Sequence, residues 1–106
     1  MEIIYNKLVR DKIPETIIAK GQTPIYRVLD DDEYLIALNQ KLQEEVAEYL
    51  ESNSTEELCD ISEVISAILA LKQCSPAEFT QTNIAKLDER GGFSKKYFLE
   101  KVLTPR

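Results

Sequence analysis

The sequence predicts an all-α protein, an antiparallel helix bundle with short extended segments at both ends. Two long stretches carry apolar residues at steps of three and four, the spacing that gathers side chains on one helix face. In the first stretch these positions are Tyr34, Leu35, Leu38, Leu42, Val46, Tyr49 and Leu50, and in the second they are Leu58, Ile61, Val64, Ile65, Ile68, Leu69 and Leu71. The polar residues 51–55 between the stretches suit a tight turn. The two helices should therefore pack against each other antiparallel.

Length and composition indicate one globular domain over residues 1–106. A content of 43% hydrophobic and 30% charged residues is typical of a folded chain. The net charge of −6 disfavours binding to nucleic acid. No stretch approaches the roughly 20 apolar residues of a membrane span, and the start lacks the pattern of a signal peptide. We therefore expect a cytoplasmic protein with no membrane partner.

The N-terminal third should hold only short elements. Met1–Tyr5 is expected to be an extended arm. A short helix should begin near Pro14, since proline is favoured in the first turn, and end before Gly21. The β-prone segment Pro24–Leu29 predicts an extended strand or arm.

Three longer helices follow, each marked by capping residues. The acids Asp30–Asp32 favour a helix N-terminus and predict a helix over about Glu33–Ser52. The second should span about Ser54–Cys74. A serine, a proline and a glutamate predict the third over Pro76–Arg90, which Gly91 ends. Its apolar face is thin, so it should pack at one side of the bundle.

Two cysteines lie on the second long helix, at positions 59 and 74. They are about four turns apart, too far to form a disulfide with each other. We expect buried, reduced thiols.

Four acids at the edges of the two apolar faces form the main candidate site. Glu45 and Glu48 lie one turn apart on the first long helix, and Glu57 and Asp60 one turn apart on the second. Antiparallel packing would bring the four carboxylates together near the turn, where their repulsion and lost hydration need compensation. Because the chain has no histidine, the ligands would all be oxygen, which favours Mg²⁺ first and Mn²⁺ second.

An ordinary structural role is the alternative for Glu57. Ser54 followed three residues later by Glu57 fits a capping box, in which the glutamate serves only the helix start. Acids at such spacing are also common on solvated helix faces. This alternative explains either pair alone, but it does not account for two pairs that face each other.

Two groups of cations are candidate phosphate ligands. Lys7, Arg10 and Lys12 lie close together near the N-terminus. Arg90 and Lys95 flank the two adjacent glycines that follow the last long helix. Arginine and lysine can hold phosphate oxygens that a metal leaves free. A solvated helix end and a plain glycine cap remain the alternatives for the two groups.

The acidic motif resembles a known family. Glu44-Glu45-x-x-Glu48, a spacer and Glu57-x-x-Asp60, preceded by Lys41, is similar to the signature of the MazG-like all-α nucleoside triphosphate pyrophosphohydrolases. The opening residues 5–14 and the closing residues 90–93 resemble a small stand-alone, phosphoribosyl-ATP pyrophosphohydrolase-like branch of that superfamily. The spacer is short, and a histidine typical of phosphoribosyl-ATP enzymes is absent.

The resemblance implies Mg²⁺-dependent hydrolysis of a nucleoside triphosphate at the α–β anhydride, giving the monophosphate and pyrophosphate. It implies that Glu45, Glu48, Glu57 and Asp60 hold the metal, with Glu44 and Lys41 in catalytic roles. It also implies a homodimer or homotetramer that shares its active sites, and exposed apolar surface on the two long helices would argue the same way. Two alternatives stay open: phosphoribosyl-ATP pyrophosphatase activity in histidine synthesis, and a non-catalytic nucleotide-binding helical module.

Overall fold

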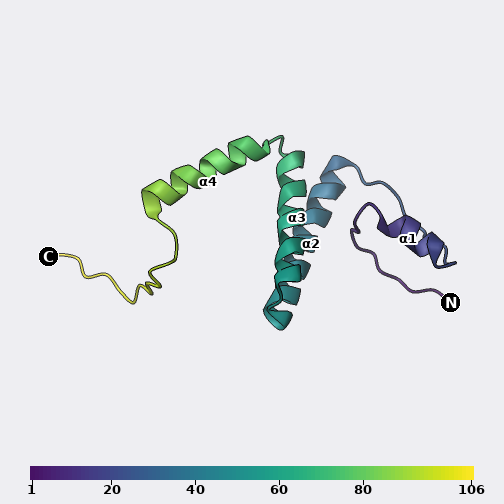
Figure 1. Ribbon diagram of the computed structural model, residues 1–106, viewed down its shortest axis with the longest axis horizontal. Coiled ribbons are helices and arrows are strands. Elements are labelled where there is room, and N and C mark those ends of the chain that lie inside the picture. The colour runs from purple at the N-terminus through teal and green to yellow at the C-terminus, as the bar shows by residue number, and fades with distance from the viewer. The chain divides into compact units, whose positions relative to one another are not determined.

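The chain forms four α-helices and no β-strand, as a computed structural model of residues 1–106 shows (Figure 1). The helices are α1 (Ile13–Ala19), α2 (Asp31–Ser52), α3 (Thr55–Leu71) and α4 (Pro76–Arg90). The all-α class is confirmed. The possible strand at residues 24–29 does not form; this segment has no regular structure. A β-strand needs a neighbouring strand to pair its backbone N–H and C=O groups, and the chain forms no second strand.

Contacts divide the chain into two compact units, Met1–Cys74 and Ser75–Arg106. The first, the N-terminal unit, contains α1, α2 and α3. The second, the C-terminal unit, contains α4 and the segment that follows it. None of the four helices is long and apolar enough to cross a membrane.

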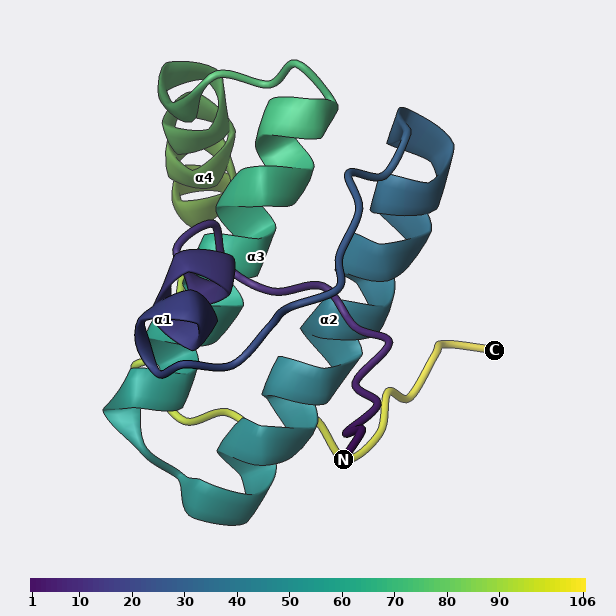
Figure 2. The ribbon, with the colours of Figure 1, turned by 90° about the vertical axis from the view of Figure 1, so that its right-hand side faces the viewer.

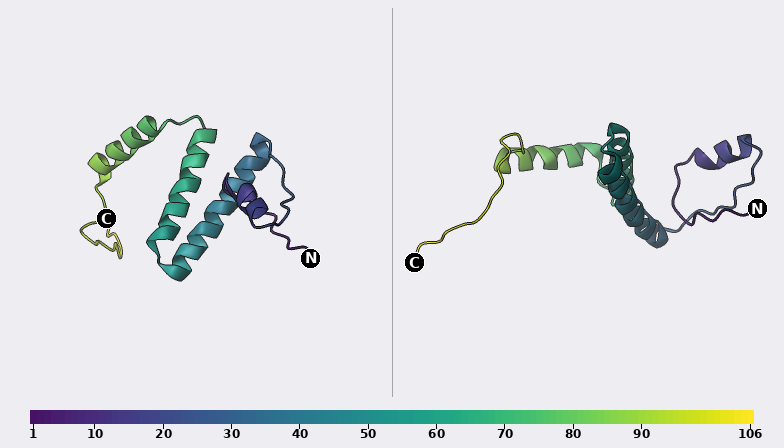
Figure 3. Two further views of the ribbon diagram at one scale, coloured as in Figure 1. Left: turned by 45° about the vertical axis from the view of Figure 1, so that its right-hand side comes forward. Right: turned by 90° about the horizontal axis from the view of Figure 1, so that it is seen from below.

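An antiparallel hairpin of α2 and α3 is the centre of the N-terminal unit (Figures 1 and 3). Local capping sets its ends. Asp30 Oδ1 accepts a hydrogen bond of 2.8 Å from the Glu33 N–H, so α2 starts at Asp31, two residues earlier than expected. Asn53, with a left-handed φ of 54°, ends α2. Ser54 Oγ then accepts from the Glu57 N–H at 3.4 Å and caps α3.

The end of α3 lies three residues before the expected one. Gln73 adopts a left-handed φ of 60°, and the Cys74 N–H donates to the Leu69 carbonyl at 2.9 Å. This pattern closes the last helical turn and prevents its continuation. The expectation that both thiols are buried is wrong: Cys59 is exposed, because it lies on the outer side of α3, and Cys74 is half-buried beyond the helix. No disulfide joins them.

The buried core is small. Leu38 of α2 and Val64 of α3 are the only buried apolar side chains, and both lie on the faces predicted to meet. Of the other predicted apolar positions, Val46, Leu50 and Leu58 are exposed, and the rest, such as Leu42 and Ile68, are half-buried. The predicted α4 has the expected bounds, but none of its residues is buried. Large apolar side chains therefore remain exposed on all four helices.

Candidate functional site

Three of the four predicted acids meet between α2 and α3. Glu45 of α2 and Glu57 and Asp60 of α3 each offer a carboxylate oxygen, and the three oxygens lie within 4.8 Å of one another. Glu45 is only 6% exposed, whereas Glu57 and Asp60 are half-buried. The arrangement follows from the hairpin: each acid takes a position on, or at the edge of, the apolar face of its helix.

The Glu57 carboxylate does not serve as a helix cap. A complete capping box needs the glutamate side chain to accept a hydrogen bond from the Ser54 N–H. That N–H instead donates to Ser52 Oγ at 3.2 Å. Ser54 still caps the backbone of α3, so one of the two hydrogen bonds of a capping box forms and the other does not. The Glu57 carboxylate therefore belongs to the acidic cluster and not to the helix cap.

Two carboxylate oxygens of the cluster have no hydrogen-bond partner. Glu45 Oε2 and Glu57 Oε2 are both shielded from solvent and both unpaired. Burial, first of all, raises the pKa of Glu45, and the neighbouring Glu48 adds to this effect against the opposing Lys41. Burial also raises the pKa of Glu57, together with the negative charges of Asp60 and Glu45. Buried polar atoms are normally satisfied, so the two orphan oxygens call for a positive partner.

Lys41 and the N-terminal segment bring three cations to the edge of this cluster. Within α2, Lys41 Nζ lies 3.2 Å from Glu45 Oε1 and 3.5 Å from Glu44 Oε2. The segment before α1 runs past the hairpin, as Figure 2 shows, and places two more ion pairs there. Lys7 Nζ lies 3.2 Å from Glu44, and Arg10 Nη2 lies 2.7 Å from Asp60 Oδ1.

Glu44 and Glu48 flank the cluster and differ from its members. Burial alone would raise the pKa of Glu44, but the hydrogen bond from Lys7 and the charges of Lys41 and Lys7 outweigh it and lower that pKa. Glu48 is exposed. It is close enough to influence the pKa values of both Glu45 and Glu57, yet its oxygens are not within the 4.8 Å group.

The remaining predicted phosphate ligands lie elsewhere. Lys12 precedes α1 and forms no ion pair. Arg90 ends α4 in the C-terminal unit, and Lys95 Nζ stands 6.0 Å from the ring centroid of Tyr97. The assignment of these three residues to phosphate stays a prediction. Lys7 and Arg10 pair with acids 37 and 50 residues away, and no residue pattern in the sequence indicates these pairs.

The cluster fits a hard divalent cation by its chemistry. All its donors are carboxylate oxygens, the ligand type that Mg²⁺, Mn²⁺ and Ca²⁺ prefer. Oxygens around Mg²⁺ are separated by about 3.0 Å for neighbours and about 4.2 Å across the ion, from metal–oxygen distances of about 2.1 Å. The three oxygens already lie within 4.8 Å of one another, so rotation of the side chains would be enough to bring them to these spacings. A bound cation would place a positive charge beside the two carboxylates that each have an unpaired oxygen.

Comparison with known proteins does not assign a family. An uncharacterized protein of Mycolicibacterium smegmatis is 64% identical over 42 residues, which cover 40% of this chain and 43% of that protein. The match therefore spans less than half the length of the relative, whose name states no activity. No family model matches the chain. No solved structure matches it either.

Proposed function

We propose that this protein is a Mg²⁺-dependent nucleoside triphosphate pyrophosphohydrolase of the MazG-like type, which cleaves the α–β anhydride to a monophosphate and pyrophosphate. One observation carries the proposal. Glu45 and Glu57, on facing helices, each have a buried and unpaired carboxylate oxygen, and both residues belong to a cluster with Asp60. Solvated surface acids do not leave oxygens unpaired and shielded from water, so the cluster is better explained as a cation site.

The acids would hold Mg²⁺ through Glu45, Glu57 and Asp60, with Glu48 completing the set. When bound, the metal would neutralise triphosphate charge, polarise the phosphorus and lower the pKa of a bound water. Glu44 has a lowered pKa, so its carboxylate stays ionised and can accept a hydrogen bond from the attacking water. Its low proton affinity suits orienting that water.

The cations would stabilise the charge that develops on the phosphate oxygens. Lys41 is fixed by two acids of its own helix, so it is preorganised beside the cluster. Lys7 and Arg10 now neutralise Glu44 and Asp60. A metal ion on Asp60 would take over that task and leave the guanidinium free for a phosphate, which arginine binds with two parallel hydrogen bonds.

Assembly into a homodimer belongs to the same proposal. The α2–α3 hairpin leaves large apolar side chains uncovered, among them Ile36, Leu50 and Leu58, the second of which is 68% exposed. A second copy of the hairpin, packed about a two-fold axis, would bury such residues in a four-helix bundle. Light scattering at micromolar concentration tests this. A mass near 12 kDa, that of one chain, would refute it.

The decisive assay incubates the pure protein and Mg²⁺ with a panel of nucleoside triphosphates. We expect pyrophosphate and the monophosphate. Orthophosphate as the product, or no product from any nucleotide, would reject the function. Glu57→Gln should abolish turnover while it keeps the backbone cap of α3, and Glu63→Gln, an exposed glutamate of the same helix, is the matched control.

Two further measurements separate the alternatives. Complementation of a strain that lacks phosphoribosyl-ATP pyrophosphatase would show whether that compound is the substrate. Calorimetry with Mg²⁺ and a non-hydrolysable triphosphate would reveal a nucleotide-binding module if binding is tight and no nucleotide is turned over.

A further inference from the structure

The C-terminal unit holds a pocket that the acidic cluster does not explain. It has a volume of about 560 Å³ and is lined by the last turns of α4 and the residues directly after it. All of its lining residues are exposed, so the pocket is an open hollow on the surface of this unit. The lining includes Asn83, Lys86, Leu87, Arg90, the two glycines and Phe93.

The polar lining comes from one face of α4. Asn83, Lys86 and Arg90 are separated by three and four residues, so their side chains project from the same side of the helix. Neither cation forms an ion pair, although Asp88 and Glu89 are adjacent in sequence. Two neighbouring cations repel each other when they lack a counter-charge. An anion between them would remove this repulsion.

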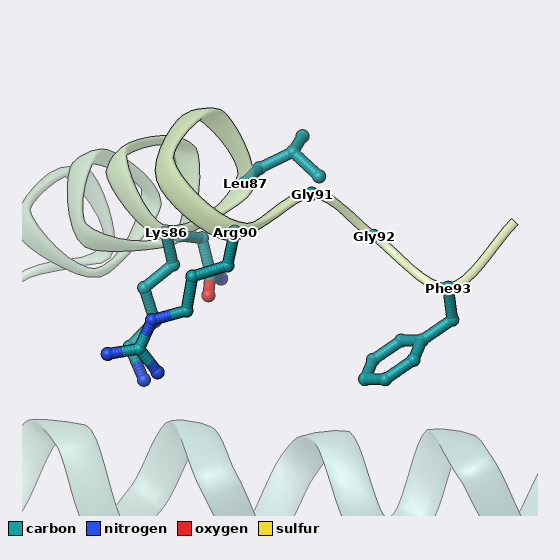
Figure 4. A pocket seen from close by; sticks show the side chains of 7 residues that line it. Lys86, Leu87, Arg90, Gly91, Gly92 and Phe93 are labelled. Carbon is teal, nitrogen blue, oxygen red and sulfur yellow. The ribbon is translucent and has the colours of Figure 1, made fainter. Parts of the chain in front are cut away.

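Two glycines turn the chain so that an aromatic ring joins this face. Gly91 has φ 80° and ψ 178°, a conformation that is essentially restricted to glycine. Its N–H donates to the Leu87 carbonyl at 2.8 Å. A Cβ on Gly92 would stand 3.6 Å from Leu87 Cδ1, so this backbone lies directly against the leucine. Figure 4 shows the Phe93 ring extending to the same side as the Lys86 and Arg90 side chains.

The charge of the two units differs in sign. Residues 75–106 contain six Lys and Arg against four Asp and Glu, whereas residues 1–74 contain seven against fifteen. The positive charge of this otherwise acidic chain is therefore concentrated in the unit that carries the pocket. Phe93 is 98% exposed, and so large an aromatic surface is available to stack on a planar ligand.

From these observations we infer that the pocket is a metal-independent binding site for a nucleoside monophosphate. Lys86 and Arg90 hold the phosphate, and the Phe93 ring stacks on the base. Nucleotide bases stack on aromatic side chains, and arginine and lysine are the usual phosphate ligands. The combination of two unpaired cations with an exposed ring favours a nucleotide over inorganic phosphate, which needs no ring. The site needs neither Mg²⁺ nor the acidic cluster, so it stands apart from the proposed hydrolysis.

The test measures binding of adenosine 5′-monophosphate to the full chain in EDTA, by calorimetry and by amide chemical shifts. The background is Glu57→Gln, so a failure of the proposed hydrolysis leaves this result readable. We expect shifts concentrated in residues 83–93, and weaker binding to both adenosine and inorganic phosphate. Equal affinity for inorganic phosphate and the nucleotide would overturn the role of the ring, and no binding of the nucleotide would overturn the site.

Matched variants locate the contacts. Arg90→Gln should weaken nucleotide binding about tenfold or more, and Phe93→Leu about 5- to 100-fold. Lys101→Gln and Tyr97→Leu remove an exposed charge and an exposed ring of the same unit and should change affinity less than twofold. Gly91→Ala removes no ligand group, yet it should weaken binding because it redirects the chain. Circular dichroism checks that α4 persists. If the control variants lose as much nucleotide affinity as Arg90→Gln and Phe93→Leu, binding is due to non-specific charge and the inference is overturned.

Discussion

The substitution Glu45→Gln tests the candidate site at its most buried position. Glu45 is 6% exposed; Lys41 pairs with its Oε1, and its Oε2 has no partner. Glutamine keeps the shape of the side chain and removes the charge. Lys41 keeps its second partner, Glu44, so the change leaves no unpaired buried cation.

The expected change in the free energy of unfolding follows from the unpaired Glu45 oxygen. A buried acceptor without a partner costs about 1–3 kcal/mol, and glutamine also supplies a donor to the acid-rich surroundings. We therefore expect Glu45→Gln to leave metal-free stability unchanged or to raise it by up to about 2 kcal/mol. For a domain of this size each 1 kcal/mol shifts the Tm by about 4–8 °C. Mg²⁺ should raise the Tm of the parent but not of the variant, and turnover should fall by at least about 100-fold.

Thermal melts in EDTA and in Mg²⁺, beside the pyrophosphate assay, measure these effects. Glu51→Gln is the control, because Glu51 is an exposed glutamate of the same helix without a partner. Two results would refute the reasoning: a parent protein whose Tm does not respond to divalent cations, or a Glu45→Gln variant with near-parent turnover. A large loss of metal-free stability would instead show that Glu45 serves as a structural partner of Lys41.

Three other perturbations have definite expected outcomes. The pKa values of Glu45 and Glu57 lie above the ordinary 4.5, so the stability that these groups contribute is complete below pH 4.5 and is lost as the pH rises through the raised values. The pKa of Glu44 is lowered, so its contribution to stability has the opposite pH dependence. That contribution is lost at lower pH, as the pH falls through the lowered pKa. Melts in EDTA should therefore show a decline from pH 4.5 towards 7 that Mg²⁺ removes; a metal-free Tm that rises over this range would contradict the burial of the cluster. Arg10→Gln removes an exposed ion pair and should change the free energy of unfolding by less than about 1 kcal/mol, while kcat/KM falls at least tenfold; unchanged kinetics would exclude Arg10 from substrate binding. Ser54→Ala removes the α3 cap and should cost about 1 kcal/mol in a urea titration; Ser62→Ala, exposed within the same helix, should cost nothing comparable.

Local signals in the sequence were sufficient for the helices. Ser54 and Ser75 each accept from the backbone N–H three residues later, as their capping patterns predicted, and Asp30, one of three candidate caps, does the same for α2. A cap depends on a few consecutive residues, so it can be recognised without tertiary information. The apolar periodicity likewise placed Leu38 and Val64 on the buried faces. The end of α3 was not predicted correctly, because it depends on a left-handed backbone conformation at Gln73 and glutamine is not typical of that conformation.

The candidate site could be predicted only in part from residue spacing, and the rest depends on tertiary contacts. Residue spacing alone predicts that Glu45, Glu57 and Asp60 lie where the two apolar faces meet, because an antiparallel hairpin has one way to bury both faces. Two features are visible only in the folded chain. The Ser54 N–H donates to Ser52 Oγ and not to the Glu57 carboxylate, and Lys7 and Arg10 pair with acids 37 and 50 residues away. Such contacts depend on the path of the intervening chain and on competition between nearby polar groups. Residue spacing encodes neither of them.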